Sequence, residues 1–316
     1  MIQDKIIKLI EYIECEIKKL EYEKLIESIK SNKDLLYLFD DDKNIYYKIS
    51  DREMSKCMTH LHKCVIKTKE YPFLCEYIDM YLQRNLEELD KQNDYGCSAL
   101  MLACINSNNL SNDETVDILL KYKPNLEIKD KHGHTALMYA SGKSNTISSN
   151  TTVKKLIEAG SDVNAQENRG STPLLISCIM SKSRDSNAKT IEMLLEAGSN
   201  PMIHSNSRFA FEEILNLDED HPELIKLFFD HGFKLEKLEH FHNAIPSKKF
   251  ESLKIMLLNC NDFNIKIGKH KMIRLLSMLD NGEELVKIAI SRGANKEDLL
   301  TDKERKLFEI YSKLEN

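Results

Sequence analysis

Near the middle of the chain stands the stretch Gly133-His134-Thr135-Ala136-Leu137-Met138-Tyr139-Ala140, which recurs on both sides. Thirty-seven residues earlier the chain reads Gly96-Cys97-Ser98-Ala99-Leu100-Met101-Leu102-Ala103. Thirty-seven residues later it reads Gly170-Ser171-Thr172-Pro173-Leu174-Leu175-Ile176-Ser177, and a fourth copy places Phe211 in the same register. A repeat at constant spacing indicates an array of similar units, each packed on its neighbours, and not one globular core.

A second apolar segment follows each copy. Its apolar residues recur at positions i, i+3 and i+4, the spacing that places them on one face of a helix. Three of these segments end at Gly160, Gly198 and Gly232, where a helix commonly needs a left-handed residue to stop. Each unit is therefore predicted to contain a turn, a short helix, a loop and a second helix.

This unit resembles the ankyrin repeat, whose signature T-P-L-H-x-A recurs with a period of about 33 residues. The best match is Thr172-Pro173-Leu174, and Asp162-Val163-Asn164 is similar to the stretch that follows the second helix in that family. The longer period comes from polar residues predicted in the loop between the two helices of a unit. The resemblance implies an all-α ankyrin-repeat solenoid of about seven helix-turn-helix repeats over residues 56–296, with helical caps at both ends.

The two flanking regions have a different pattern. Residues 1–55 are expected to form a helical cap region, because apolar residues in 2–29 recur at three- and four-residue steps. The alternative for this helix is a short coiled coil or a partner-binding element. Residues 297–316 are expected to form a polar capping helix at the C-terminal end.

Composition excludes several classes of protein. The formal net charge is −6 and the basic residues are scattered, which argues against a duplex-binding surface. No apolar run is long enough to span a bilayer, and the first residues lack the pattern of a secretory signal. We therefore expect a cytoplasmic protein, with buried thiols and no disulfide framework among its irregularly spaced cysteines.

Motifs for enzymatic chemistry were sought among the polar residues. Cys57, His60, His62 and Cys64 are residue types that bind metals, but His62 falls on the histidine of the repeat signature and Cys64 on its alanine. A structural role is therefore favoured for them. No phosphate-binding loop, nucleophile elbow or zinc-protease motif occurs. The sequence thus predicts no enzyme, no metal and no cofactor.

The resemblance implies a binding surface on the turn tips and on the exposed side of the first helices. At the tips the register selects Asp94, Tyr95, Cys97, Lys131, His132, His134, Asn168, Arg169, Ser171, Ser205, Asn206 and Arg208. On the first helices it selects Ile105, Asn106, Gly142, Lys143, Ile179 and Met180. Since the tips become basic along the array, we expect the partner to be a protein with an acidic segment. The alternative is a row of tips that is merely solvated.

Three functional readings follow from the resemblance. The first is a non-enzymatic, monomeric scaffold that binds another protein through its concave ankyrin face. The second is a substrate adaptor for ubiquitin ligation, acting through the N-terminal helix, and the third is an enzyme with a cryptic site. The composition and repeat variants are similar to ankyrin proteins of giant amoeba viruses, which would make the partner a host or viral protein and the host cytoplasm the location. Parasites with AT-rich genomes are the competing source. Asn164 is also similar to asparagines that are hydroxylated in ankyrin repeats.

Overall fold

The computed structural model divides into two compact units, residues 1–168 and 169–316. It describes the ranges 20–21, 23–27, 47–49, 52–54, 58–107, 111–144, 148–181, 188–206, 208–235, 241, 244, 249–260, 266–267, 270–271, 276–277, 279 and 282–294. The predicted cap helix over 2–29 lies mostly outside these residues, although 20–21 and 23–27 are helical. The predicted helix over 297–316 lies wholly outside them.

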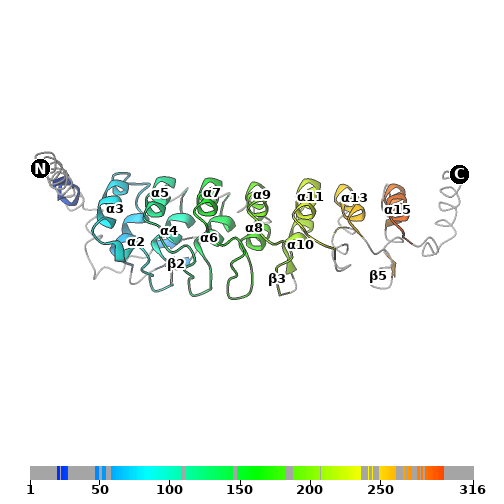
Figure 1. Ribbon diagram of the computed structural model, residues 1–316, viewed down its shortest axis with the longest axis horizontal. Helices are drawn as coiled ribbons and strands as arrows, with labels where there is room; N and C mark the ends of the chain where they lie inside the picture. Colours follow the sequence, from blue (N-terminus) through cyan, green and yellow to red (C-terminus); the bar gives the residue numbers. More distant parts are fainter. Residues whose placement is uncertain are drawn as a thin grey trace, which may run out of the picture. The chain divides into compact units, whose positions relative to one another are not determined.

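In the first unit the described helices come in consecutive pairs (Figure 1). The pairs are α2 (His60–Val65) with α3 (Leu74–Leu82), α4 (Ala99–Ile105) with α5 (Asp113–Lys121), and α6 (Ala136–Gly142) with α7 (Asn150–Glu158). Helices α2, α4 and α6 pack in one row and α3, α5 and α7 in a second. The remaining elements are a short 3-10 helix, η2 (Leu86–Glu88), and the antiparallel strands β1 (Tyr47–Ile49) and β2 (Arg52–Met54).

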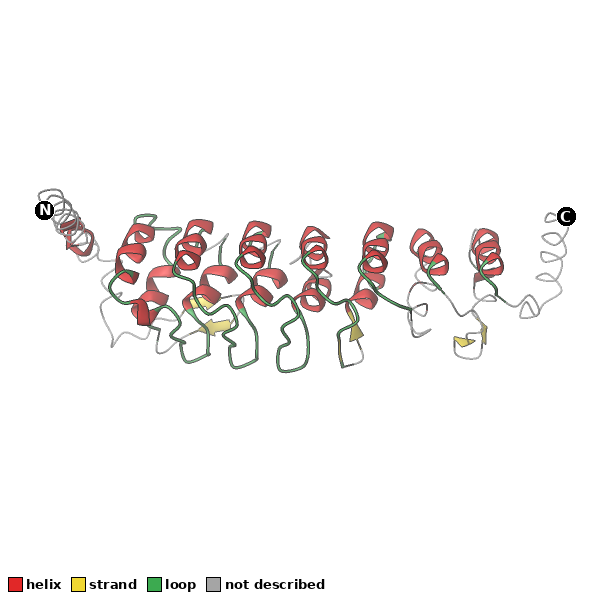
Figure 2. Cartoon of the chain, in the orientation of Figure 1, coloured by secondary structure: helices red, strands yellow, loops and turns green. Residues whose placement is uncertain are grey.

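The second unit repeats this arrangement. It contains α8 (Pro173–Ser181) with α9 (Ala188–Glu196), α10 (Ala210–Leu215) with α11 (Pro222–Asp230), and the helices α13 (Phe250–Leu258) and α15 (Gly282–Ser291). Its strands form two antiparallel hairpins, β3 (His204–Ser205) with β4 (Arg208–Phe209), and β5 (Lys266–Ile267) with β6 (His270–Lys271). Figure 2 shows both hairpins in the connections that precede a helix or lie between helices. Five of the predicted helix pairs are thus confirmed, whereas the first helices expected before α13 and α15 lie mostly outside the described residues.

The first helix of a repeat begins directly after the serine or threonine of the repeated stretch. The hydroxyls of Ser98 and Thr135 accept hydrogen bonds from the backbone N–H groups of Met101 (3.3 Å) and Met138 (3.4 Å). Thr172 caps α8 in the same way, accepting from the N–H of Leu175 at 3.2 Å. A hydroxyl before the first helical turn satisfies a donor that the helix itself leaves unpaired. Each of these three first helices therefore begins directly after a capping hydroxyl.

The core of each unit lies between the two rows of helices. Every residue of α4 is buried, and the small residues Ala103, Ala140 and Ser177 have no exposed surface. Their size lets neighbouring first helices approach closely. All cysteines from Cys64 to Cys260 are free and buried, as predicted, whereas Cys15 and Cys57 lie outside the described residues.

Buried hydroxyls cross from one repeat to the next, which the sequence did not predict. Thr115 in α5 donates to Thr68 at 2.8 Å, and Thr68 lies 3.3 Å from the hydroxyl of Ser111. One repeat later, Thr152 in α7 donates to Ser107 at 2.8 Å. These side chains are less than a tenth exposed. Because water does not reach them, each hydroxyl provides the hydrogen-bond partner that the other needs.

Candidate protein-binding surface

The tips of the first unit are two closely similar turns, Asn93–Cys97 and Asp130–His134. In each turn the first side chain accepts two backbone N–H groups. Asn93 Oδ1 accepts from Tyr95 and Cys97, both at 3.0 Å. Asp130 Oδ1 accepts from His132 at 2.9 Å and from His134 at 2.8 Å. A short side-chain acceptor that binds the backbone two residues on stabilises a tight turn.

Asp130 is the charged centre of the second tip. Its second oxygen, Oδ2, accepts a hydrogen bond from the hydroxyl of Tyr139 in α6 at 2.5 Å. The His134 Nδ1 atom lies 3.5 Å from Oδ1, and the His134 ring packs on Tyr139. Burial by itself would raise the pKa of Asp130, but the hydrogen bonds from His134 and Tyr139 outweigh it and lower this pKa to about 2. The carboxylate therefore stays ionised and fixes the tip on α6.

Backbone hydrogen bonds also join neighbouring tips. The N–H of Lys131 donates to the carbonyl of Tyr95 at 3.0 Å, and the N–H of Asn168 donates to the carbonyl of His132 at 3.0 Å. The Asn168 side-chain amide adds a third bond, to the carbonyl of Lys131 at 3.0 Å. The conformation of each tip is thus fixed by main-chain contacts, and its outer side chains are left to face solvent.

Gly133 allows the second and third tips to approach this closely. Its φ is +87°, in the left-handed region that favours glycine, and a Cβ at this position would lie 2.6 Å from the backbone nitrogen of Asn168. No other residue type fits that space without moving the neighbouring turn. The sequence indicated a tight turn here, and the structure adds the contact between tips.

Several predicted residues are exposed in the first unit. We call Asp94, Tyr95, Lys131, His132 and Asn168 the first-unit tip surface, because all five are exposed. The ring of Tyr95, with 38% of the residue accessible, supplies apolar area, and the exposed Lys131 of the next tip supplies a cation. Arrangements of this kind suit a partner with carboxylates and some apolar surface.

Other predicted tip residues of the first unit are covered. Cys97 is only 1% exposed, and burial raises the pKa of its thiol to about 12. His134 is half-buried against Asp130 and Tyr139. On the first helices, Ile105, Asn106 and Gly142 are buried, because this side of α4 and α6 packs inside the unit. Cys97 and these three residues therefore do not contribute to the exposed surface.

The second unit carries its own cations at the tips. Arg169, Asn206 and Arg208 are exposed, whereas Ser171 is half-buried. Ser205 is buried, and its hydroxyl donates to the carbonyl of Arg169 at 2.6 Å. This bond connects two successive tips, as the backbone bonds do in the first unit.

His204 extends this surface beyond the residues that the sequence selected. It is exposed at the start of β3, and its ring lies 5.0 Å from that of Phe209 in β4. The register could have revealed it, since position 204 corresponds to Asp130 and no longer carries a short acceptor. We call Arg169, His204, Asn206 and Arg208 the second-unit tip surface.

The histidine of the repeat signature has a structural role. His62 is buried in α2, where Nε2 lies 2.9 Å from the carbonyl oxygen of Cys97 and Nδ1 lies 2.6 Å from the hydroxyl of Thr59. Burial lowers the pKa of His62 to about 4, so the ring is neutral at physiological pH. His60 binds Tyr77 instead, with Nε2 and the phenol oxygen 2.7 Å apart.

Metal and membrane sites were sought over the same described residues. Within these ranges no group of three or more His, Cys, Asp or Glu side chains is placed to hold a metal ion. None of the helices in the described part of the chain is long and apolar enough to cross a bilayer.

Asn164 lies in the extended segment after α7. It is partly exposed, and its backbone N–H donates to Asp162 Oδ1 at 2.9 Å, which closes a local turn. This turn comes just before the third tip, which contains Asn168.

Comparison with known proteins agrees with this geometry. The family model described as ankyrin repeats (3 copies) matches residues 61–167 and 111–205. Among solved structures, the chain is similar to the ankyrin repeat domain of Bcl-3, a member of the IkappaB protein family. The TM-score is 0.55 at 18% identity, over 74% of this chain and 98% of that one. A search of curated proteins found no match. The matched repeats imply a scaffold for protein–protein interaction.

Proposed function

This chain carries ankyrin repeats, and we propose that it is a non-enzymatic scaffold that holds a protein with an acidic segment on its tip surfaces. The observation that supports the proposal is the exposure of Lys131, His132, Arg169 and Arg208 on turns that are joined by hydrogen bonds to backbone carbonyls. Rigid turns lose little conformational freedom on binding, so more of the contact energy contributes to affinity.

Charge at the tips differs from that of the whole chain. The formal net charge is −6, yet the two tip surfaces carry one acid, Asp94, against three cations and two histidines, which are Lys131, Arg169, Arg208, His132 and His204. Local positive potential on an acidic protein selects partners with a complementary charge and repels others. Tyr95 adds apolar contact of the kind that anchors protein interfaces.

Charge reversal provides the test. The triple variant Lys131→Glu, Arg169→Glu, Arg208→Glu should lose partners in affinity purification with mass spectrometry that wild type retains. For a purified partner we expect affinity to fall by about tenfold or more, since three exposed ionic contacts are each worth about 0.5–1 kcal/mol. Equal recovery of all partners by wild type and variant would contradict the proposal.

A matched control separates location from charge. Lys154, Lys189 and Lys226 are exposed on the second helices α7, α9 and α11, away from the tips. Their triple replacement by Glu changes the net charge by the same amount. If partners bind through the tips, this control variant should retain the same partners as wild type.

Two finer readings remain proposals. An adaptor for ubiquitin ligation would act through residues 1–55, so deletion of that region should remove copurifying ligase subunits and leave tip binding intact. A host or viral partner is suggested only by the resemblance to viral ankyrin proteins, and the identity of the recovered partner tests it.

Hydroxylation of Asn164 is a separate proposal, motivated by its family-like sequence context and partial exposure. Peptide mass spectrometry of protein from oxygen-replete cells should detect an added oxygen on this side chain. Only unmodified Asn164 in that experiment would remove the proposal.

A further inference from the structure

The resemblance to ankyrin repeats implies an exposed side on the first helices, yet in the first unit this side is covered. On α4 it carries Leu102, Ile105 and Asn106, which are at most 2% exposed. Residues three and four positions apart lie on one face of a helix. We call these three residues, and their equivalents in the other first helices, the inner stripe. The inner stripe of α4 therefore lies under another part of the chain.

The inner stripe of α2 is covered as well. Counted from the capping residues Thr59 and Ser98, Lys63 and Ile66 occupy the positions of the first two stripe residues of α4. Lys63 is 5% exposed and Ile66 is 1% exposed. Burial of a lysine to this degree is rare on the open side of a helix. The cover thus extends over two consecutive first helices.

The second unit shows the same stripe in a more open state. The repeat register places Ile176, Ile179 and Met180 of α8 at the three stripe positions of α4, and all three are only half-buried. The connection to the following helix has a similar length in both repeats, 106–112 after α4 and 182–187 after α8. The length of this loop therefore does not account for the difference, and the first unit needs a cover of its own.

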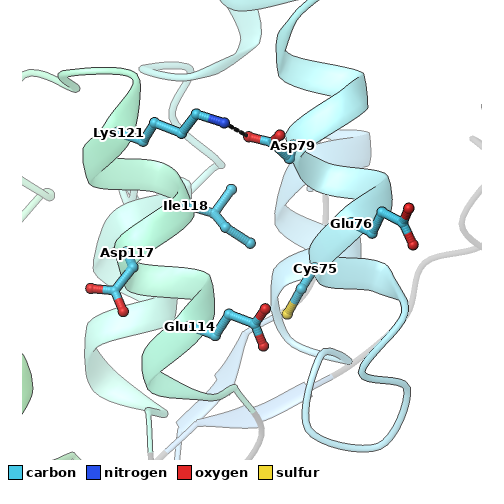
Figure 3. A pocket seen from close by; sticks show the side chains of 7 residues that line it. All are labelled: Cys75, Glu76, Asp79, Glu114, Asp117, Ile118 and Lys121. Atoms are coloured by element: carbon cyan, nitrogen blue, oxygen red, sulfur yellow. Dashed lines mark hydrogen bonds and ion pairs between the residues drawn. The ribbon is translucent and has the colours of Figure 1, made fainter. Parts of the chain in front are cut away.

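The opposite side of the same repeats is solvated. Figure 3 shows the pocket between α3 and α5, which Lys121 crosses to reach Asp79, with 2.7 Å between Nζ and Oδ1. Glu76 and Asp117 are exposed there and point away from the pocket on opposite sides. Charged, exposed side chains are typical of an uncovered helix face. The cover is consequently limited to the first-helix side.

The β1–β2 hairpin is the described element that directly precedes these helices in the chain. Strand β2 ends at Met54 and α2 begins at His60, so the connection spans at most about 20 Å when fully extended. Figure 1 draws β2 below α4, and Figure 3 shows two strands behind α3 and α5, on the first-helix side. The hairpin is therefore within reach of the inner stripes of α2 and α4.

The register of the hairpin gives it one mainly apolar face. The pairs are Tyr47 with Met54, Ile49 with Arg52, and Lys48 with Glu53. Because successive residues of a strand alternate between its two faces, the first two pairs share one face and the third pair lies on the other. A two-stranded hairpin is at best marginally stable alone, so its apolar face needs a surface to pack on. The mainly apolar stripes of α2 and α4 are such a surface.

We infer that the β1–β2 hairpin is an internal ligand of the first unit. Its face with Tyr47, Ile49 and Met54 lies on the inner stripes of α2 and α4 and closes them to external partners. The inner stripe of α8 is left accessible. A partner that approaches the first helices must therefore displace the hairpin or bind to the second unit.

Thiol labelling measures the cover, because Ile105 and Ile179 are the same residue type at the same repeat position. Each is replaced by cysteine in a full chain that also carries Cys15→Ser and Cys57→Ser, and maleimide labelling of each site is followed by peptide mass spectrometry. We expect Ile105→Cys to react at least about tenfold more slowly than Ile179→Cys, since reaction requires an accessible thiol. Equal rates would overturn the inference, because the stripe of α4 would then be as open as that of α8.

A charged hairpin identifies the cover. Ile49→Glu with Met54→Glu places two charges on the apolar face of the hairpin, and it should raise the labelling rate of Ile105→Cys by at least about tenfold. Cys104, which has no exposed surface in α4, should stay unreactive and so report that the helix remains folded. Protection of Ile105→Cys that persists in this variant would mean that another segment is the cover, which contradicts the inference.

The other face of the hairpin supplies the matched control. Lys48→Glu with Glu53→Lys exchanges the charges of one cross-strand pair and leaves the apolar face intact. The labelling of Ile105→Cys should then remain as slow as with the natural hairpin. Loss of protection here would show that the apolar face is not what holds the hairpin in place.

Photo-cross-linking decides the matter if the charged hairpin variant unfolds α4. Tyr47 is replaced by p-benzoyl-phenylalanine, which keeps an aromatic ring at that position. Irradiation of the full chain should give cross-links to α2 or α4, and cross-links confined to α3, α5 or the second unit would overturn the inference. None of these substitutions lies on a tip surface, so failure of this inference and failure of the proposed tip binding are separable.

Discussion

His62 Nε2 and the carbonyl oxygen of Cys97 lie 2.9 Å apart inside the first unit, and this bond joins one repeat to the tip of the next. Because the ring is buried, protonation is disfavoured in the folded state and the pKa of His62 is about 4, compared with 6.5 when unfolded. Below pH 6.5 the unfolded chain therefore binds a proton that the folded chain does not. The contribution of the neutral His62 ring to the free energy of unfolding is therefore complete above pH 6.5, and it is lost as pH falls towards 4.

The His62 contribution can be measured from unfolding at a series of pH values. The free energy of unfolding should fall by up to about 1.4 kcal/mol for each pH unit in this window. His62→Gln keeps a donor for Cys97 but cannot titrate, so its pH dependence between 6.5 and 4 should be flatter. Parallel curves for wild type and variant would contradict the assignment.

Asp130 gives a separate pH window. Its pKa is lowered from 3.8 to about 2, so its stabilising effect is complete above about pH 4 and is lost as pH falls to 2. Asp130→Asn keeps the acceptor oxygen that Asn93 provides in the preceding tip, but weakens the bond from Tyr139. We expect a loss of about 1–3 kcal/mol at neutral pH, measured by urea unfolding. A variant as stable as wild type would show that the Tyr139 bond is not needed.

Gly133 and Gly160 form a matched pair for the contact between tips. Both have a positive φ, +87° and +94°, but only at Gly133 would a Cβ meet another residue. Gly160→Ala should cost about 1–2 kcal/mol from backbone conformation alone. Gly133→Ala should cost at least about 1 kcal/mol more and broaden the amide signals of residues around Asn168. Equal losses of stability would mean that the tips can separate without penalty.

Thr152 tests the buried hydroxyls between repeats. Thr152→Val leaves the Ser107 hydroxyl without its 2.8 Å partner, in a site that water does not reach. The expected loss is about 1–3 kcal/mol in denaturant unfolding. Lys154→Ala, at an exposed position of the same helix, should change stability by less than about 0.5 kcal/mol. The hypothesis fails if the two variants unfold at the same denaturant concentration.

Local signals explain why the helices could be predicted from sequence. Thr135 and Thr172 precede apolar residues at helical spacing, and both cap the helices that follow. Pro173 is the first residue of α8, a position where the missing N–H of proline costs no helical hydrogen bond. Each of these assignments depends on residues that are close in the chain.

Contacts between repeats explain what the sequence did not predict. Thr115 and Thr68 are forty-seven positions apart in the chain. Without the structure, each polar side chain would be expected at the surface. Cys97 and Arg208 follow the tip in the same register, yet Cys97 is buried and Arg208 is exposed. The register of the repeat therefore predicts which residues lie at a tip. Whether such a residue is exposed depends on its own side chain and on the residues that pack against it.

The main-chain bonds from Lys131 to Tyr95 and from Asn168 to His132 use no atom of the Lys131, Tyr95 or His132 side chains. These three side chains can consequently be exchanged without loss of the bonds that keep the turns in place. Such a frame permits rapid divergence of recognition during evolution, and it allows new recognition residues to be grafted while the scaffold keeps its stability.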